Sequence, residues 1–118
     1  MSYDIELQDP VTGRVIELDK PHQMKGGTYA IGGTNLAELN ITYNYCKHFY
    51  RLFGDNGIRF IYGKTAAETL PLLKDGAALL GGDVSDDYWE PTEGNAKAAL
   101  MQLVALAQMR PDGVWAGD

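Results

Sequence analysis

Residues that could supply a nucleophile or a redox centre are scarce in this chain of 118 residues. It contains one cysteine, Cys46, two histidines, and two serines, Ser2 and Ser85. A single cysteine cannot form a disulfide within the chain and suits a reducing compartment, so we expect a cytoplasmic protein. Neither serine lies in the Gly-x-Ser-x-Gly pattern of hydrolases, and the sequence therefore offers no catalytic serine.

Long hydrophobic runs are also absent. The longest strongly apolar run, residues 98–107, is shorter than the roughly 20 residues that a membrane-spanning helix needs. The first residues, MSYDIELQD, are acidic and alternating, unlike the basic start and apolar core of a signal peptide. We therefore expect no membrane partner, and a single globular domain over residues 1–118.

The formal net charge of −6 is placed unevenly along the chain. Residues 83–118 carry seven acidic and two basic residues, so most of the excess lies in the last third. Residues 44–64 carry one acidic residue and four basic ones, Lys47, Arg51, Arg59 and Lys64. An acidic chain is a poor binder of duplex DNA, whereas a basic patch within it suits an anionic small ligand. The two segments could also meet across two copies of the chain, so a homo-oligomer stays open.

Alternating patterns predict strands in the first half of the chain. Residues 3–8 and 14–18 alternate on either side of DPVTG, which predicts a β-hairpin whose turn places Gly13 at a positive φ. A loop is expected next, over residues 19–27. Further strand patterns occupy residues 28–31, 36–43 and 57–63.

A first helix is predicted over residues 46–53. Asn44 is suited to be its N-cap, and Gly54 suits its end. Apolar side chains recur on one face at intervals of three and four: Cys46, Phe49, Tyr50 and Phe53. Because Cys46 lies on this face, we interpret it as a small hydrophobe, and His48 as a half-buried structural residue.

A second helix is predicted to run to about Leu80, and its start has two readings. Thr65 and Glu68 form a capping-box pattern, but Pro71 would then lie inside the helix, at a cost of roughly 3 kcal/mol. With Thr69 as the N-cap, Pro71 would fall in the first turn, which is the less costly reading.

A third helix is predicted from the N-cap Thr92 to Met109, and its pattern is apolar on most sides. Gly94 and Asn95 are poor helix formers in its first turn, which suggests that another part of the chain packs closely there. The natural candidates are the aromatic residues Tyr88, Trp89 and Trp115. The patterns together predict an α+β fold, with a small antiparallel sheet of N-terminal hairpins packed against three helices and the C-terminal helix most buried.

Known motifs for cofactors and metals do not match. Gly57 and Gly63-Lys64-Thr65 enclose five residues rather than the four of a phosphate loop, and those five resemble a strand. The glycines of GGTYAIGG do not fit the dinucleotide fingerprint. The acids before the third helix lack the calcium-loop pattern, and the histidines lack zinc spacing. The sequence therefore predicts no cofactor, no metal and no catalytic residue.

Two surfaces are candidates for binding. Exposed aromatic side chains surrounded by charge often anchor protein contacts. Such residues precede the third helix and predict a surface for a basic protein partner: Asp86, Asp87, Tyr88, Trp89 and Glu90. Stacking rings together with cationic groups are typical of sites for nucleotides and other anions. A second surface of that kind, beside the glycines of residues 26–33, would comprise His22, Lys25, Tyr45, Lys47, Arg51, Arg59 and Tyr62.

Three stretches, DPVTGRVIELDKPHQMKGGTYA, ITYNYCKHFY and YWEPTEGNAKAAL with the later LAQMRPDGVW, resemble a set of small uncharacterised proteins of bacteriophages, prophages and their bacterial hosts. The resemblance covers nearly the full chain. It implies an accessory or host-interacting role, and no particular activity or cofactor.

The sequence favours binding over chemistry. A protein-protein interaction through the acidic segment is the first hypothesis, and a small-ligand or nucleotide-binding protein is the alternative. An enzyme that transfers protons through His22, His48 and tyrosines comes third, because nothing in the sequence brings those groups together.

Overall fold

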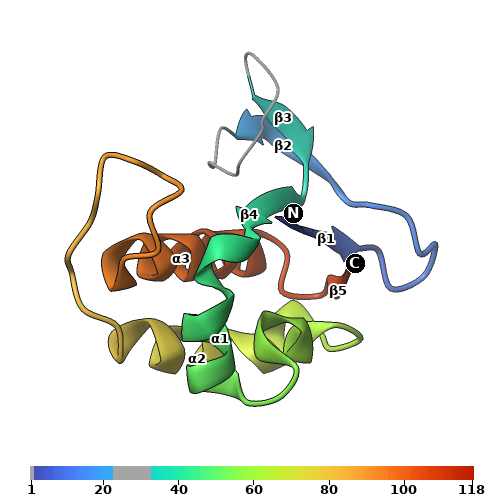
Figure 1. Cartoon of the computed structure of the whole chain (residues 1–118). Helices are drawn as coiled ribbons and strands as arrows, with labels where there is room; N and C mark the ends of the chain where they lie inside the picture. The colour runs from blue at the N-terminus through green and yellow to red at the C-terminus, as the bar shows by residue number, and fades with distance from the viewer. Residues whose placement is uncertain (1, 23–32) are drawn as a thin grey trace.

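The computed structural model describes residues 2–22 and 33–118, and the fold is α+β as the sequence predicts. Figure 1 shows the order of the elements along the chain. They are β1 (Ser2–Gln8), β2 (Glu17–His22), β3 (Thr34–Leu36), β4 (Glu38–Thr42), the 3-10 helix η1 (Tyr43–Tyr45), α1 (Cys46–Phe53), the 3-10 helix η2 (Gly57–Ile61), α2 (Ala66–Ala78), α3 (Glu93–Met109) and β5 (Val114–Gly117).

The central sheet has the strand order β4-β1-β5, with both pairings antiparallel. The predicted alternation of β1 is confirmed, because Tyr3, Ile5 and Leu7 are all buried. Ile5 is paired with Leu39 of β4, and Leu7 with Trp115 of β5. Apolar side chains thus line up on one face of the sheet, which packs against the helices.

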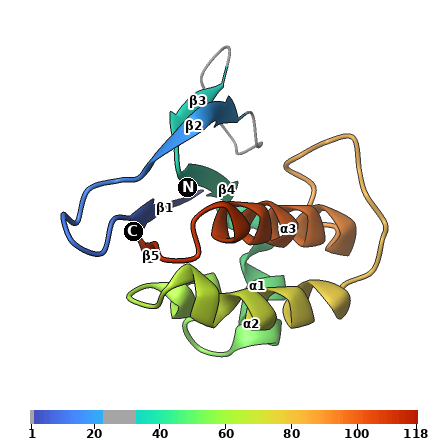
Figure 2. The ribbon, with the colours of Figure 1, turned by 180° about the vertical axis from the view of Figure 1, so that it is seen from behind.

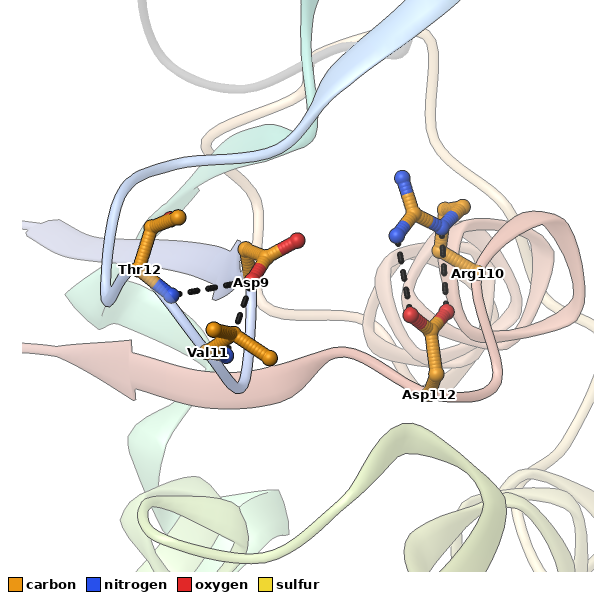
Figure 3. Close-up of polar contacts among 5 residues, drawn as sticks. All are labelled: Asp9, Val11, Thr12, Arg110 and Asp112. Carbon is orange, nitrogen blue, oxygen red and sulfur yellow. Dashed lines mark hydrogen bonds and ion pairs between the residues drawn. The ribbon is translucent and has the colours of Figure 1, made fainter.

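The turn after β1 forms as predicted. The carboxylate of Asp9 accepts hydrogen bonds from the backbone N–H groups of Val11 and Thr12 (Figure 3), and Gly13 has a φ of 71°. These two donors hold the pKa of the Asp9 carboxyl below its ordinary value. The return arm differs from the predicted hairpin, since residues 14–18 meet β1 only at the bridge between Gln8 and Val15.

Instead, the chain leaves the central sheet and forms a second one. β2 pairs with β3 in a two-stranded sheet, so the prediction of a loop over residues 19–27 is wrong for the part up to His22. Figures 1 and 2 show that this arm projects on the side of α3 opposite to α2. The predicted strand 28–31 and Lys25 lie outside the described residues. The predicted strand 36–43 is divided at Ala37, between β3 and β4.

Two local predictions around α1 are wrong. Asn44 does not cap the helix; Thr42 caps the preceding turn, η1, through its side-chain oxygen and the N–H of Asn44. Tyr50, predicted on the buried face, is 40% exposed, whereas Phe49 is fully buried. The buried residues of α1 are His48 and Phe49, so the buried face of the helix is centred on these two residues and leaves Tyr50 at its edge.

Residues 57–61 form the 3-10 helix η2 and not the predicted strand over 57–63. Ile58 and Ile61 are both fully buried, and this spacing of three brings them to one side of a 3-10 turn. In a strand they would point to opposite faces. The apolar content of the segment was therefore compatible with either structure, and the packing decides between them.

The N-cap of α2 is Thr65, so the favoured reading with Thr69 as the N-cap is wrong. The side-chain oxygen of Thr65 accepts from the N–H of Glu68, and the Glu68 carboxylate accepts from the N–H of Thr65. Thr69 is needed inside the helix, where its hydroxyl donates to the carbonyl of Ala66 and accepts from the indole of Trp115. Pro71 therefore lies within the helix, on its exposed side.

The third predicted helix is confirmed as α3, with Thr92 as its N-cap, and it is the most buried helix. Nine of its residues are buried, and it packs along α2. It ends at Met109, after which Arg110 and Asp112 form a two-bond ion pair across the turn into β5 (Figure 3). Within residues 2–22 and 33–118, no helix has both the length and the apolar character to cross a membrane.

Candidate partner-binding surface

The segment between α2 and α3, residues 81–92, is here named the acidic loop. It has no regular secondary structure, and in Figures 1 and 2 it arches outward before it meets the first turn of α3. It carries four of the acids of the sequence, Asp83, Asp86, Asp87 and Glu90. A loop of this length is expected to be mobile unless side chains fix its backbone.

Asn95, in the first turn of α3, fixes the backbone of the acidic loop through its side chain. Its side chain is 7% exposed and makes three hydrogen bonds to the loop backbone. The oxygen accepts from the N–H of Ser85 at 3.0 Å, and the amide nitrogen donates to the carbonyls of Asp87 and Glu90, both at 3.0 Å. Asn95 thus satisfies three backbone groups of a loop that has no ladder of its own.

Gly94 lets the loop approach α3 closely. A β-carbon at this position would lie 2.6 Å from the carbonyl carbon of Asp83 and 2.7 Å from the nitrogen of Val84. The sequence prediction that something crowds the start of α3 is therefore confirmed, but the predicted neighbours Tyr88, Trp89 and Trp115 are not the ones that fill this space. It is occupied by the loop backbone.

We expect Gly94→Ala to destabilise the protein by about 1 to 2 kcal/mol. In an exposed helix the same change would stabilise by up to about 1 kcal/mol, but here the methyl group meets backbone, and overpacking of this kind costs about 1 to 3 kcal/mol. Urea unfolding followed by circular dichroism measures the difference. Gln108→Ala, on the exposed side of the same helix, is the control and should change the free energy of unfolding by less than about 0.5 kcal/mol. A stabilised Gly94→Ala variant would contradict the close packing.

Tyrosine side chains tie the acidic loop to the body of the protein. The hydroxyl of Tyr88 accepts from the N–H of Thr42 at 2.8 Å, and the hydroxyl of Tyr45 donates to the carbonyl of Tyr88. Burial raises the pKa of Tyr45 to about 12 and also raises the pKa of Tyr88. Tyr88, predicted as a partner-binding residue, is therefore half-buried, and its main role is to hold the acidic loop against Thr42 and Tyr45.

The 3-10 helix η1 and the helix α1 together supply three further contacts. The amide of Asn44 donates to the carbonyl of Trp89 at 2.8 Å, and Nε2 of His48 donates to the carbonyl of Pro91 at 2.8 Å. These contacts agree with the interpretation of His48 as structural, but the residue is buried and not half-buried as predicted. A guanidinium nitrogen of Arg51 lies 3.7 Å from the carboxylate of Glu93, a long and exposed ion pair. These contacts hold the end of the acidic loop that leads into α3.

The side chains that face outward are the acids and two apolar groups. Asp86, Asp87 and Glu90 are exposed, Trp89 is 49% exposed and Val84 is 69% exposed. Two of the acids also order the loop, since Asp87 accepts from the N–H of Trp89 and Glu90 accepts from the hydroxyl of Ser85. Four of the five predicted partner-binding residues, all but Tyr88, are thus exposed on the acidic loop.

A pocket of about 170 Å³ opens beneath this surface. Its walls come from the acidic loop through Val84, Asp86 and Tyr88, and its floor from α3 through Ala98 and Gln102. Tyr45 also lines the pocket. This residue, predicted to bind a ligand, is therefore buried and does not lie on the outer surface. Asp86 is the one charged residue that lines it among the described residues.

An uncharged stripe of α3 continues from the pocket. Ala98, Gln102, Ala105 and Met109 follow at intervals of four, three and four, which places them on one side of a helix. The stripe ends at a second hollow of about 520 Å³, lined by Met109, Arg110 and the strand β2 with His22. The face of α3 between the acidic loop and β2 therefore offers side chains without charge.

The predicted ligand-binding residues do not form one site. Arg59 donates to the main-chain oxygen of Asp118 at 2.7 Å and to the hydroxyl of Tyr43 at 2.8 Å, and its guanidinium carbon lies 4.9 Å from the ring centre of Tyr3. Tyr62 donates to the same oxygen of Asp118, and burial raises its pKa to about 12. The guanidinium of Arg59 is therefore already bound by groups of this chain.

The other members lie elsewhere. Lys47 is exposed on α1, Arg51 is paired with Glu93, and a ring nitrogen of His22 lies 2.8 Å from the carbonyl of Leu36 in the two-stranded sheet. Lys25 is outside the described residues. Among residues 2–22 and 33–118 there is also no group of three or more side chains that could hold a metal ion.

Sequence reasoning missed Asn95, Val84, Ala98 and Gln102 as residues of this surface. Asn95 carried a signal: an asparagine after a glycine in the first helical turn is unfavourable for the helix and needs another reason. The others carried none, because small or uncharged residues on a helix are ordinary.

In comparisons with known proteins, no family model, curated protein or solved structure matches the chain.

Proposed function

We propose that this protein acts by binding a basic protein partner through the acidic loop, and that it is an accessory protein without a reaction of its own. One observation carries the proposal: the backbone of the loop is fixed by hydrogen bonds to the buried side chain of Asn95, while its acids and Trp89 are exposed beside a pocket. Fixed loops lose little conformational entropy on binding, so the contacts they make contribute more fully to affinity.

Charge favours a basic partner. Asp86, Asp87 and Glu90 are exposed and contribute no ion pair within the described residues, where the two ion pairs are Arg51 with Glu93 and Arg110 with Asp112. A patch of one sign attracts a partner of the opposite sign and raises the rate of association. Trp89 adds the kind of aromatic anchor that dominates many protein interfaces. The resemblance to phage and prophage proteins is in keeping with a partner in a host cell.

The acidic loop can be tested by removing its charge without removing its hydrogen bonds. The triple variant Asp86→Asn, Asp87→Asn, Glu90→Gln keeps the acceptor oxygens that hold Trp89 and Ser85. Wild type and variant are used to capture proteins from a lysate of cells that carry the sequence, and the main partner is then measured in purified form. We expect the triple variant to bind at least about tenfold more weakly, mainly through a slower association rate, and with less dependence on salt.

A matched triple variant controls for net charge. Asp55→Asn, Asp75→Asn and Glu38→Gln make the same change at exposed positions away from the loop, and should leave the affinity within about twofold. Equal partners and equal affinities for the two triple variants would overturn the proposal.

A further inference from the structure

The pocket under the acidic loop is too small for most ligands. Sites for drug-sized molecules and cofactors occupy roughly 300 to 1,000 Å³, whereas this pocket occupies about 170 Å³. A nucleotide would not be enclosed by it. A single amino-acid side chain would be, and the pocket opens on the surface that we assign to a protein partner. The size therefore points to one inserted side chain.

The lining points to a long cationic side chain. Among the residues that line it are the apolar Val84 and Ala98, the aromatic Tyr88 and the acidic Asp86. An apolar stem could lie against the first two residues while its charged end meets the carboxylate. A neutral aliphatic side chain would leave Asp86 without a partner, and an acidic one would be repelled by it.

Arginine fits this lining better than lysine. Its guanidinium is flat, stacks on aromatic rings and binds carboxylates with two hydrogen bonds, and it is more weakly hydrated than an ammonium group. A pocket with one carboxylate beside a tyrosine ring uses all of these properties. Lysine would lose more hydration and could not stack.

Resting on the proposed function, we infer that the pocket between Asp86, Tyr88 and Ala98 is a receptor for one arginine side chain of the partner. The partner's arginine enters between the acidic loop and α3, and its neighbours lie along the uncharged stripe of α3. Asp86 and the pocket then supply specificity, while Asp87 and Glu90 supply attraction at longer range.

The probe is capped arginine, N-acetyl-arginine methylamide, titrated into the full chain labelled with ¹⁵N. We expect the backbone amide signals of Ser85, Asn95 and Gln102 to shift with a dissociation constant in the range of about 1 to 10 mM, typical of one side chain in a small pocket. Capped citrulline, which has the same shape without the charge, should bind at least about tenfold more weakly, and capped lysine should lie between the two.

Two alanine-to-leucine variants of α3 complete the test, one at the exposed Ala98 and one at the half-buried Ala105. Ala98→Leu fills the pocket and should abolish the shifts, whereas Ala105→Leu, the same change two turns further along, should leave them unchanged. Equal binding of arginine and citrulline, or no shift with arginine at about 50 mM, overturns the inference.

Partner capture separates this inference from the proposed function. If Ala98→Leu keeps full affinity for a partner that the neutralised triple variant loses, the acidic loop binds the partner without the arginine pocket, and the inference alone fails. If neither variant changes the captured proteins, the proposed function fails as well.

Discussion

Replacing Asn95 by aspartate is expected to destabilise the protein by more than about 3 kcal/mol at pH 7, and replacing it by alanine by about 2 to 3 kcal/mol. Alanine removes three hydrogen bonds to the acidic loop, each of which contributes roughly 0.5 to 1.5 kcal/mol, and returns about half a kcal/mol through its better helix propensity. Both variants should also lose partner binding, although Asn95 itself is buried, because the loop is no longer held.

Aspartate should be worse than alanine for an electrostatic reason. The amide nitrogen of Asn95 donates to the carbonyls of Asp87 and Glu90, so a carboxylate oxygen in its place would face two carbonyl oxygens while it is shielded from water. The favourable position of a negative charge near the start of α3 offsets only about 0.3 to 1 kcal/mol of this.

The same reasoning gives a dependence on pH. The introduced carboxyl group should have a pKa above its ordinary value when folded, because both burial and the two carbonyls disfavour its charge. The folded state then binds the proton more tightly than the unfolded state, so the extra penalty of aspartate over alanine is full at pH 7 and decreases as the pH falls toward 4.

Urea unfolding of both variants at pH 7, 5.5 and 4 measures this difference. Gln108→Ala again serves as the surface control. A difference between Asn95→Asp and Asn95→Ala that stays constant with pH would show that the amide nitrogen does not face the two carbonyls.

The predictable part of the fold is the part that depends on near neighbours. The N-cap Thr92, the end at Met109 and the apolar periodicity place α3 correctly, and Glu68 beside Thr65 marks the true start of α2. The preference for Thr69 failed because it weighed the cost of Pro71 alone. The hydroxyl of Thr69 is required by Trp115, which is 46 residues away in sequence, and no local pattern contains that requirement.

Long-range strand pairing explains why the sequence did not predict β5 or the division of the strands into two sheets. β5 joins the sheet because Val114 and Trp115 pair with Gln8 and Leu7 of β1. A segment of four residues after a helix carries too little pattern to predict a strand. The division of the strands into two sheets is likewise decided by partners, since β2 pairs with β3 and not with β1. Short strands have weak preferences of their own, and their neighbours select the structure.

The candidate surface was predictable only in its charged part. Runs such as Asp86, Asp87 and Glu90 stand out in a sequence, and Trp89 beside them suggests an anchor. The pocket depends on where the acidic loop crosses α3, which is determined by Gly94 and Asn95 acting on backbone groups that are several residues away. Hydrogen bonds from one side chain to a distant backbone leave no periodic signal, so Ala98 and Gln102 could not be assigned to the surface in advance.

We expect Trp115→Ala to be the most destabilising single substitution considered, at about 3 to 5 kcal/mol. The indole is 1% exposed, and its ring nitrogen donates to the hydroxyl of Thr69 at 2.8 Å inside the core. Because small domains are stable by only about 5 to 15 kcal/mol in total, this change should unfold a measurable fraction of the protein at 37 °C. Thermal unfolding by circular dichroism measures the loss.

Milder substitutions show whether the loss comes from packing or from the hydrogen bond. Thr69→Val keeps the volume but leaves the indole N–H without an acceptor, at a cost of about 1 to 3 kcal/mol. In a Trp115→Phe background the N–H is absent, so Thr69→Val should cost at least about 1 kcal/mol less than it does in the wild type. If the two costs are equal, the contact between Trp115 and Thr69 does not stabilise the fold, and β5 is held by its pairing with β1, by its backbone hydrogen bonds to Gly63 and Lys64, and by packing.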